Sequence, residues 1–409
     1  MPPRSFISRG PAGSLSGGER DKDMTPDILY FDNAATSSPK PPETLRAMRQ
    51  FMEDGGGSPG RSGHRLSIAA GRVIFAAREV LAGLFGVDDP LRIVLTKNAT
   101  EALNIAAVGL IKPGDHVITS GMEHNSVMRP LRALEAAGVA LTVVHCSAAG
   151  ELDPDDVRAA IRTETKAVFL THASNVTGTI MPVADVGRIA RDRGLLFCVD
   201  AAQTAGALPV DVGRMGIDLL AFTGHKSLFG PQGTGGLYIR EGLEEAIPPL
   251  MRGGTGSRSE FEEQPAFMPD RYESGTPNTV GIAGLSAGAG FVAARGVDAI
   301  RRREEALTER FLAGLRDLDG VTVYGPKAAS RQMPVVSFRI AGLDPAEAAL
   351  KLDERFGILS RPGLHCAPAA HRTIGTAPTG TLRFSFGYFN TEAEIRTALD
   401  AVDRLRSGI

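Results

Sequence analysis

The sequence predicts an α/β protein built on a mainly parallel, doubly wound sheet, followed by a smaller α+β domain. Between residues 92 and 199, apolar strand-like runs alternate with helical stretches, and such alternation is typical of parallel sheets with helices on both faces. From about residue 288 the pattern changes to a long helix rich in Arg, Glu and Ala, followed by short strands. The length of 409 residues also suits a large domain with a smaller partner.

Each element of the large domain is predicted from its own apolar run. The expected strands are 92–96, 116–119, 140–145, 167–171, 195–199 and 218–222. The expected helices begin near residues 101, 127, 154 and 183. Ligands on sheets of this kind gather at the carboxyl ends of the strands, so the residues that follow each run are the candidates for a site.

The C-terminal part is predicted from shorter elements. Strands are expected at 321–324, 335–340 and 380–385, with a helix over 345–356. We therefore expect a large domain over residues 28–287 and a small domain over 288–409. Residues 1–27 are rich in Gly, Ser, Pro and charge without periodicity, which predicts a disordered leader, with Met24 as an alternative start.

Composition restricts the classes of partner. The net charge is -2, from 45 basic and 47 acidic residues, so no overall field favours nucleic acid or a membrane. No apolar run approaches the roughly 18 to 20 residues of a membrane span, and the start does not resemble a signal peptide. The three cysteines form no metal-site spacing and no disulfide framework. A cytoplasmic protein with a small-molecule substrate and no metal site is expected.

Two residues at strand ends form the most informative pair. Asp200 ends the run 196–200, and Lys226 follows the run 218–222. A lysine can form a Schiff base, and an acid can keep a pyridine nitrogen protonated; pyridoxal 5'-phosphate (PLP) enzymes need both groups. A lone strand-end Asp is more often a helix cap, and a lone Lys is usually solvated, so the pair depends on further residues.

A phosphate-binding site is predicted where the expected strand 92–96 is followed by its helix. The segment Asn98-Ala99-Thr100-Glu101 opens a helix, so its backbone N–H groups and the Thr100 hydroxyl face outward at a positive helix end. Thr223 and His225 flank Lys226 and can reach the same phosphate. The alternative is an ordinary helix cap.

Two further strand ends carry polar residues. His124 lies in Met122-Glu-His-Asn-Ser126, and Asn175 lies in Ser174-Asn-Val-Thr-Gly178. The Asn175 amide can donate to the phenolic oxygen of the cofactor or to the substrate. A structural histidine and a turn are the alternatives.

The spacing of these residues resembles the class V aminotransferase branch of the fold type I PLP enzymes. The resemblance implies a seven-stranded sheet, a His124 ring that stacks on the pyridine and moves protons, and a Gln203 that binds the phenolic oxygen. The segment 271–278 resembles a Glu-x-Gly-Thr-x-Asn pattern. There the threonine, here Thr276, binds the cofactor phosphate of the neighbouring subunit, which implies a homodimer.

One cysteine indicates which of the reactions known in this branch the protein carries out. Cys366 follows Arg361 and His365 on a Gly/Pro-bounded loop, and positive charge beside a thiol favours the reactive thiolate. Cys146 and Cys198 lie in strand-like runs, where inert buried thiols are expected.

The loop around Cys366 resembles the Arg-x-Gly-x-His-Cys-Ala pattern of group II cysteine desulfurases and selenocysteine lyases. This resemblance implies that Arg383 grips the substrate carboxylate, for which a planar guanidinium is suited. We assign Arg361 and Asn175 to the substrate as well.

These residues predict a PLP-dependent cysteine desulfurase that converts L-cysteine to L-alanine and holds the sulfur as a persulfide on Cys366. Lys226, Cys366 and His124 are its expected catalytic residues, and a sulfur-acceptor protein is a further expected partner. A selenocysteine lyase is the nearest alternative. An aminotransferase, an epimerase or a carbon-sulfur lyase on the same fold is another. A non-catalytic scaffold that binds PLP or a protein is the alternative from a different class.

Overall fold

The computed structural model of the protein describes residues 28–60 and 63–408. The disordered leader expected over residues 1–27 lies outside the described residues.

A seven-stranded sheet forms the centre of the large part of the molecule, which confirms the predicted doubly wound α/β class. In spatial order its strands are β2 (Ile93–Thr96), β8 (Gly235–Ile239), β7 (Leu219–Thr223), β6 (Leu196–Asp200), β5 (Thr165–Thr171), β3 (His116–Ser120) and β4 (Ala140–Val144). Only β8 runs antiparallel to its neighbours in this sheet. The carboxyl ends of the other strands therefore meet at one edge.

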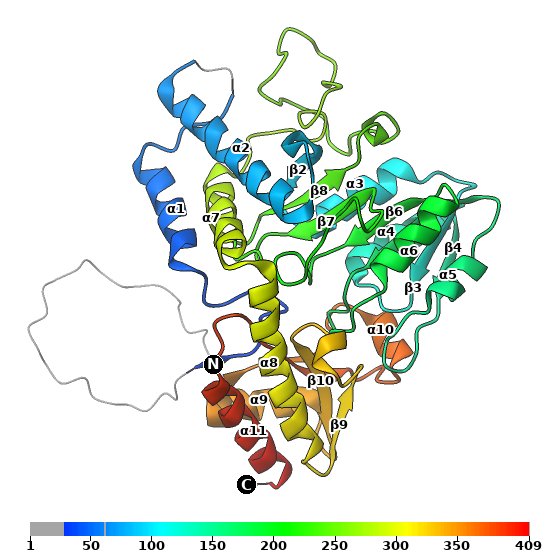
Figure 1. The fold of residues 1–409 in the computed structure, drawn as a ribbon, viewed down its shortest axis with the longest axis vertical. Helices are drawn as coiled ribbons and strands as arrows, with labels where there is room; N and C mark the ends of the chain where they lie inside the picture. Colours follow the sequence, from blue (N-terminus) through cyan, green and yellow to red (C-terminus); the bar gives the residue numbers. More distant parts are fainter. Residues whose placement is uncertain (1–27, 61–62, 409) are drawn as a thin grey trace, which may run out of the picture.

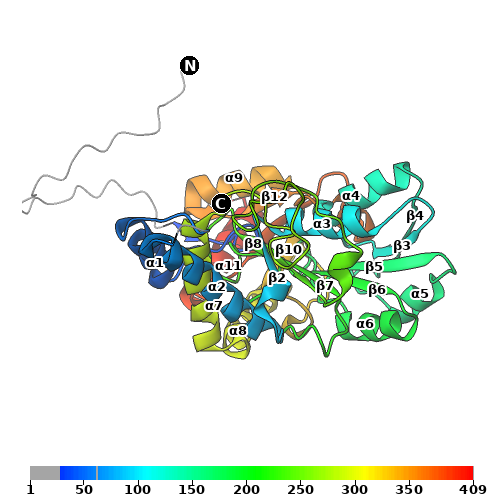
Figure 2. The ribbon, with the colours of Figure 1, turned by 90° about the horizontal axis from the view of Figure 1, so that it is seen from above.

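Helices cover both faces of this sheet, because successive strand residues point to opposite sides. On β6, Phe197 and Val199 contribute to the core on one face, and Cys198 contributes to the core on the other. Figure 2 shows α3 (Ala99–Leu110) and α4 (Asn125–Ala136) on one side of the strands, and α5 (Pro154–Ala159) and α6 (Val183–Asp192) on the other.

The expected single helix from residue 288 is wrong. The structure has two helices, α7 (Thr279–Arg295) and α8 (Val297–Arg316), which meet at Gly296 with a bend of 82°. Gly296 has a φ of 80°, a backbone conformation that favours glycine. In Figure 1, α7 packs beside α1 (Pro42–Glu53) and α2 (Arg65–Phe85), whereas α8 runs down into the smaller part. The domain boundary predicted at 287/288 falls inside α7.

The smaller part is an antiparallel sheet covered by helices. Its strands lie in the order β12 (Arg361–Gly363), β13 (Thr381–Ser385), β10 (Val335–Ile340) and β9 (Val321–Tyr324). The helices α8, α9 (Pro345–Phe356) and α11 (Glu392–Arg406) pack on it, whereas Ala370 of α10 (Pro368–Thr373) is buried in the core of the large part. Stacked and edge-on phenylalanines, including Phe311, Phe338 and Phe384, fill much of its core.

The first described strand belongs to this smaller part. β1 (Leu29–Tyr30) pairs in parallel with β11 (Ile358–Leu359), and Phe31 is buried in the phenylalanine core. The described residues therefore start against the C-terminal region and then enter the large part.

Three short 3-10 helices complete the described elements, at Pro90–Arg92, Leu243–Glu245 and Ala329–Arg331. Among the described residues no single helix has both the length and the apolar character needed to cross a membrane, and only the bent pair α7 and α8 passes that test when taken together.

Candidate active site

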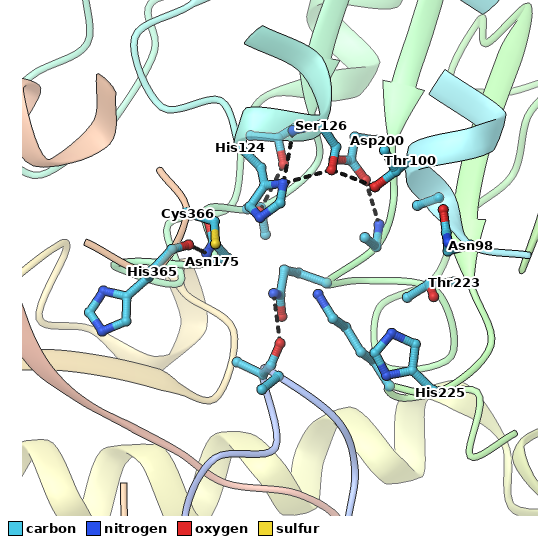
Figure 3. A pocket seen from close by; sticks show the side chains of 18 of the residues that line it. Asn98, Thr100, His124, Ser126, Asn175, Asp200, Thr223, His225, His365 and Cys366 are labelled. Carbon is cyan, nitrogen blue, oxygen red and sulfur yellow. Dashed lines mark hydrogen bonds between the residues drawn. The ribbon is translucent and has the colours of Figure 1, made fainter. Parts of the chain in front are cut away.

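A cavity of about 220 Å³ lies at the carboxyl edge of the central sheet, between the large and small parts. Every residue that the sequence assigns to the site lines it, except Thr276. These residues are Ala99, Thr100, His124, Asn175, Asp200, Gln203, Thr223, His225, Lys226, Arg361, Cys366 and Arg383. In Figure 3, His365 and Cys366 approach from one side, with Thr223 and His225 on the other.

Asp200 and Lys226 line the same cavity from the ends of neighbouring strands, with Asp200 at the end of β6 and Lys226 three residues after β7. Asp200 is the buried last residue of β6, and its Oδ1 accepts a hydrogen bond from the Ala202 N–H at 2.9 Å. Burial raises the pKa of Asp200, and Lys226 opposes this. Burial lowers the pKa of Lys226 to about 8, with Asp200 opposing the shift. A lysine whose pKa lies close to neutral pH can act both as a nucleophile and as a proton carrier.

His124 is fixed as a neutral ring at the start of α4. Its Nδ1 accepts from the Ser126 backbone N–H at 3.0 Å, so the proton of the neutral ring is assigned to Nε2. Burial lowers the pKa of His124 to about 4, and Lys226, Arg129 and Arg383 act in the same direction. The His124 ring is therefore uncharged at neutral pH, with its Nε2–H free to donate.

The start of α3 provides donors for an anion. Asn98 is the N-cap, with its Oδ1 accepting from the Glu101 N–H at 2.9 Å. The Thr100 hydroxyl lies 2.8 Å from the Ser126 hydroxyl. The first N–H groups of a helix have no partner within the helix and carry partial positive charge. Nδ1 of His225, at the same cavity, is buried without a hydrogen-bond partner among the described residues.

These features fit PLP. The cavity combines a lysine, a buried carboxylate, a helix start and an orphaned ring nitrogen, which are the donor and acceptor types that the aldehyde, the pyridine and the phosphate of that cofactor require.

The loop that carries Lys226 is tied to the N-terminal segment. The His225 carbonyl accepts from the Ser37 N–H at 3.0 Å, the Thr36 hydroxyl at 3.0 Å and the Lys40 ammonium at 2.7 Å. Burial lowers the pKa of Lys40 to about 8. This second lysine of low pKa therefore lies behind the loop and is not among the residues lining the cavity.

Cys366 is exposed on a strained turn. His365 and Cys366 have φ values of 50° and 56°, and a residue other than glycine in this region costs on the order of 1 to 3 kcal/mol. Two hydrogen bonds hold the turn: the Asn175 side chain donates to the His365 carbonyl at 2.7 Å, and the Asn125 N–H donates to the Cys366 carbonyl at 2.9 Å. The thiol is thereby presented at the cavity by a fixed backbone.

The expectation that His365 adds positive charge beside this thiol is wrong. The His365 Nε2 lies 3.0 Å from the Arg361 carbonyl, and its Nδ1 lies 3.1 Å from the His371 Nε2. The His371 Nδ1 in turn contacts the Thr376 hydroxyl at 2.7 Å. Burial lowers the pKa of His365 to about 2 and that of His371 to about 4, so both rings are neutral and brace the loop.

The other two cysteines are unsuited to nucleophilic attack. All three are free thiols. Burial raises the pKa of Cys146 to about 12, and burial also raises the pKa of Cys198 well above its ordinary value. Cys198 lies in β6 as predicted, whereas Cys146 lies just past the end of β4.

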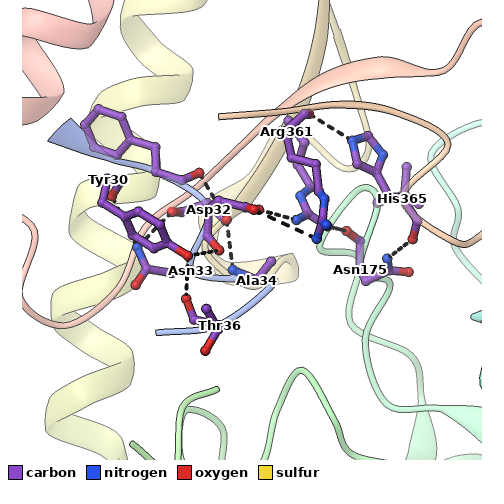
Figure 4. A network of polar contacts seen from close by, with 12 residues as sticks. Tyr30, Asp32, Asn33, Ala34, Thr36, Asn175, Arg361 and His365 are labelled. Atoms are coloured by element: carbon purple, nitrogen blue, oxygen red, sulfur yellow. Dashed lines mark hydrogen bonds and ion pairs between the residues drawn. The ribbon is translucent and has the colours of Figure 1, made fainter. Parts of the chain in front are cut away.

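Arg383 is buried at the junction of the two parts, with 2% of its side chain exposed. Its Nη1 donates to the Asn175 carbonyl at 2.9 Å, and its Nη2 donates to Asp32 Oδ1 at 2.6 Å (Figure 4). Its Nε is buried without a partner among the described residues. A planar donor with an unused edge at the cavity suits a carboxylate.

Two predicted contacts are made with protein groups. The Asn175 amide reaches the His365 carbonyl, as above, and the Gln203 amide donates to the Ala34 carbonyl at 3.2 Å. Both side chains nevertheless line the cavity.

The N-terminal segment also contributes to the site, although it was not predicted to. Ala34 and Ala35 line the cavity and Asp32 binds Arg383. Ser126, Thr171, Ala173 and Ala202 also line it without having been assigned. A short apolar run followed by Asp32 and Asn33 was the available signal, because polar residues after a strand mark other parts of the same site.

Thr276 is exposed and is displayed by an anchored segment. Before it, Glu273 pairs with Arg78 at 2.6 Å and accepts from the Leu95 N–H at 2.6 Å. After it, Asn278 caps α7 by accepting from the Gly281 N–H at 3.0 Å. The turn that carries Thr276 is therefore held in place on both sides.

Known proteins resemble this chain in sequence and fold over most of its length. Residues 29–397 match the family model described as aminotransferase class-V. The chain belongs to the class-V aminotransferase family. It is 36% identical, over 94% of its length and 96% of the relative's, to a protein of Methanothermobacter thermautotrophicus named "Probable cysteine desulfurase".

Two solved structures of the same family have similar folds. The apo structure of cysteine desulfurase from Thermococcus onnurineus NA1 superposes with a TM-score of 0.88 at 36% identity, covering 93% of this chain and 95% of that one. The cysteine desulfurase CsdA from Escherichia coli superposes with a TM-score of 0.81 at 30% identity, covering 93% of this chain and 95% of that one.

Proposed function

We propose that this family member is a PLP-dependent cysteine desulfurase, which converts L-cysteine to L-alanine and holds the sulfur as a persulfide on Cys366. One observation carries the proposal: an exposed thiol on a braced turn lines the same cavity as Lys226 and Arg383. The proposed nucleophile, the lysine that would bind the cofactor and the arginine that would bind the substrate carboxylate thus surround one cavity. The names of the relatives agree with this assignment.

Different residues of the cavity would bind different groups of the cofactor. Lys226 would anchor it, Asp200 would face its pyridine nitrogen, and His124 would lie against its ring. Gln203 would approach its phenolic oxygen. The start of α3, including Ala99 and Thr100, would hold the phosphate together with Thr223 and His225. When bound, PLP supplies an aldehyde that captures the substrate amine and a ring that withdraws electrons.

The remaining residues act on the substrate. Arg383 binds the carboxylate of L-cysteine, with Arg361 and Asn175 beside it, and so directs the substrate thiol toward Cys366. Lys226 Nζ, with a pKa near 8, and the neutral His124 ring move protons at the substrate carbons.

The sulfur transfer is a nucleophilic displacement at the substrate sulfur. The Cys366 thiolate attacks the substrate sulfur, an S–S bond forms on Cys366, and the C–S bond of the substrate breaks. The electron pair of that bond stays with the carbon skeleton, which takes up protons and leaves as L-alanine. A sulfur-acceptor protein would then remove the persulfide by thiol exchange.

The test compares the wild type with Cys366→Ala. The wild type should form alanine from L-cysteine and gain one sulfur on the peptide that carries Cys366, measured by mass spectrometry. When cysteine is added, the variant should still change the absorbance of its bound PLP, as the wild type does, but it should form neither alanine nor the persulfide. Cys146→Ala is the matched control and should retain both. Sulfur on Cys146 or Cys198 alone, or full desulfuration by Cys366→Ala, contradicts the mechanism, and pyruvate instead of alanine indicates a carbon-sulfur lyase.

A homodimer and a cytoplasmic location belong to the same proposal. The dimer is supported by the anchored, exposed turn that carries Thr276, which we assign to the phosphate of the partner subunit. The location is supported by three free thiols, one of them exposed, since a reducing compartment preserves such groups.

A further inference from the structure

Three buried side chains next to the Cys366 turn form one directed chain of hydrogen bonds. They belong to His365, His371 and Thr376. In Figure 3 the His365 ring points away from the middle of the cavity, and in Figure 4 it meets the carbonyl of Arg361. The ring therefore acts on the turn that carries the thiol and not on the reacting atoms.

The geometry assigns the proton of each ring to one nitrogen. A carbonyl oxygen only accepts, so His365 Nε2, which lies 3.0 Å from the Arg361 carbonyl, carries the hydrogen. Burial keeps both rings neutral, so His365 Nδ1 is an acceptor and His371 Nε2 donates to it at 3.1 Å. His371 Nδ1 then accepts from the Thr376 hydroxyl at 2.7 Å. Each member of the chain thus determines the direction of the next bond.

Both ends of this chain are fixed to the small sheet. Arg361 is the first residue of β12. The Thr376 carbonyl accepts from the Gly380 N–H at 2.8 Å, next to the start of β13, and from Arg339 of β10 at 2.5 Å. The chain therefore connects the strand before the Cys366 turn to the segment that leads into the strand after it.

The turn needs this support because His365 and Cys366 both have positive φ values, which are unfavourable for residues other than glycine. Asn175 and Asn125 hold the two carbonyls of the turn. The ring of His365 is held separately, by Arg361 and by His371. Without the His371 N–H, the Nδ1 of His365 would lose its donor, and the ring would no longer fix the turn.

We propose that His371 is a positioning residue for the sulfur transfer. Its Nε2–H, oriented by Thr376, locks the His365 ring and thereby holds Cys366 where its thiolate reaches the substrate sulfur. The inference rests on the proposed function, in which Cys366 is the nucleophile. Because a displacement of about 1 Å can slow a reaction on the order of 100-fold, loss of His371 slows the transfer and leaves the binding of cofactor and substrate unchanged.

Two amide substitutions distinguish the two nitrogens of His371. His371→Gln can place an N–H where Nε2 lies, whereas His371→Asn can place an oxygen where Nδ1 lies but has no donor that reaches His365. With PLP-loaded protein, rapid quenching and mass spectrometry measure the rate of persulfide formation on Cys366 in a single turnover. This rate should fall about tenfold or more in His371→Asn and stay within about threefold of the wild type in His371→Gln.

Two binding controls show whether the rest of the site is intact. The absorbance change of bound PLP on adding cysteine should keep its amplitude and its midpoint concentration in both variants. Alkylation of the Cys366 thiol by iodoacetamide should stay within about threefold of the wild type, because the thiol is already exposed.

Two further measurements do not depend on activity. NMR of protein with ¹⁵N-labelled histidine should show His365 and His371 as neutral Nε2–H tautomers. Amide hydrogen exchange over residues 361–367 should be faster in His371→Asn than in the wild type and in His371→Gln, because the turn opens more often.

The outcomes separate a positioning role from a general structural one. The proposal is overturned by an unchanged persulfide rate in His371→Asn, by an Nδ1–H tautomer on either ring, or by a rate in His371→Gln as low as in His371→Asn. Loss of the absorbance change in His371→Asn overturns it too, because the whole site would then depend on His371. Wild-type protein that forms no persulfide contradicts the proposed function. In that case faster exchange over 361–367 in His371→Asn still supports the hold of His371 on the turn, and unchanged exchange refutes it.

Discussion

At the scale of single residues, the site depends on charged groups that are buried, because water would weaken the interactions between them. Asp200 is the clearest case, because its carboxylate is buried beside Lys226. Asp200→Asn should keep PLP bound and slow turnover at least about tenfold, or about 1.4 kcal/mol of activation free energy, because a neutral pyridine is a weaker electron sink. Turnover and cofactor content measured together check this. Near-normal turnover would show that another group protonates the ring.

Lys226 should be the lysine that anchors the cofactor. Borohydride reduction followed by mass spectrometry should find PLP on the peptide of Lys226 in the wild type and no attached cofactor in Lys226→Ala. Lys40→Ala is the matched control, because burial lowers the pKa of Lys40 to about 8 as well, yet Lys40 does not line the cavity. Cofactor attached elsewhere in Lys226→Ala would refute the assignment.

The lowered pKa of Lys226 also predicts a pH dependence. Only the neutral amine attacks an aldehyde, and burial makes the amine neutral above about pH 8 instead of its ordinary 10.5. The rate at which PLP-free protein takes up PLP should therefore rise with pH and level off just above pH 8. Stopped-flow absorbance measures the rate. A rise that continues to pH 10 would show that the lysine is not desolvated.

At the scale of elements, one buried acid links two strand ends of the site. The Glu123 carboxylate follows β3, and its oxygens accept from the Ser120 hydroxyl at 2.6 Å and from the Thr171 N–H, at the end of β5, at 2.9 Å. Burial raises the pKa of Glu123 from 4.5 to about 8. The folded protein thus retains a proton that the unfolded chain releases.

This proton has a consequence for stability. Since the unfolded chain binds fewer protons between about pH 4.5 and pH 8, Glu123 makes the free energy of unfolding fall as the pH rises through this interval. Glu123→Gln should remove this contribution, so that relative to the wild type it gains about 1 kcal/mol or more between pH 5 and pH 8. Urea unfolding at the two pH values measures the change. Glu135→Gln, at an exposed position, is the control, and an equal change there would contradict the prediction.

The elements also show how far the sequence alone could lead. The parallel strands were predictable because each is an apolar run, and a strand end places its next polar residue at the common edge, as with His124 and Lys226. β8 was not predicted because it begins with Gly235 and Gly236, which leaves only a short apolar run. A side chain at Gly236 would collide with the Phe222 ring, so glycine is needed there for packing across to β7. The bend at Gly296 and the pairing of Asp32 depend on tertiary contacts that no local pattern records.

At the scale of the whole molecule, the role proposed for Thr276 requires a second subunit. A chain of 43.1 kDa should form a dimer by light scattering. Thr276→Ala should leave the dimer intact and weaken PLP retention about tenfold, because one charge-assisted hydrogen bond to the phosphate is lost. The rate of PLP loss on dilution measures retention. A fully active monomer, or unchanged retention in Thr276→Ala, would exclude a shared phosphate site.

Contacts between the N-terminal segment and the C-terminal region, such as the pairing of β1 with β11, determine the order in which parts of the site can form during synthesis. All seven strands of the central sheet have been made once residue 239 has been added, but Asp32 must wait for Arg383, 351 residues further along the chain. At the usual rate of about 5 to 20 residues per second, the interval after β8 lasts on the order of ten seconds. Until residue 366 has been added, the nascent chain already has Lys226 and lacks both Cys366 and Arg383. A ribosome that stops between residues 276 and 366 therefore releases a chain that has the residues proposed to hold PLP but not the thiol that takes sulfur from cysteine.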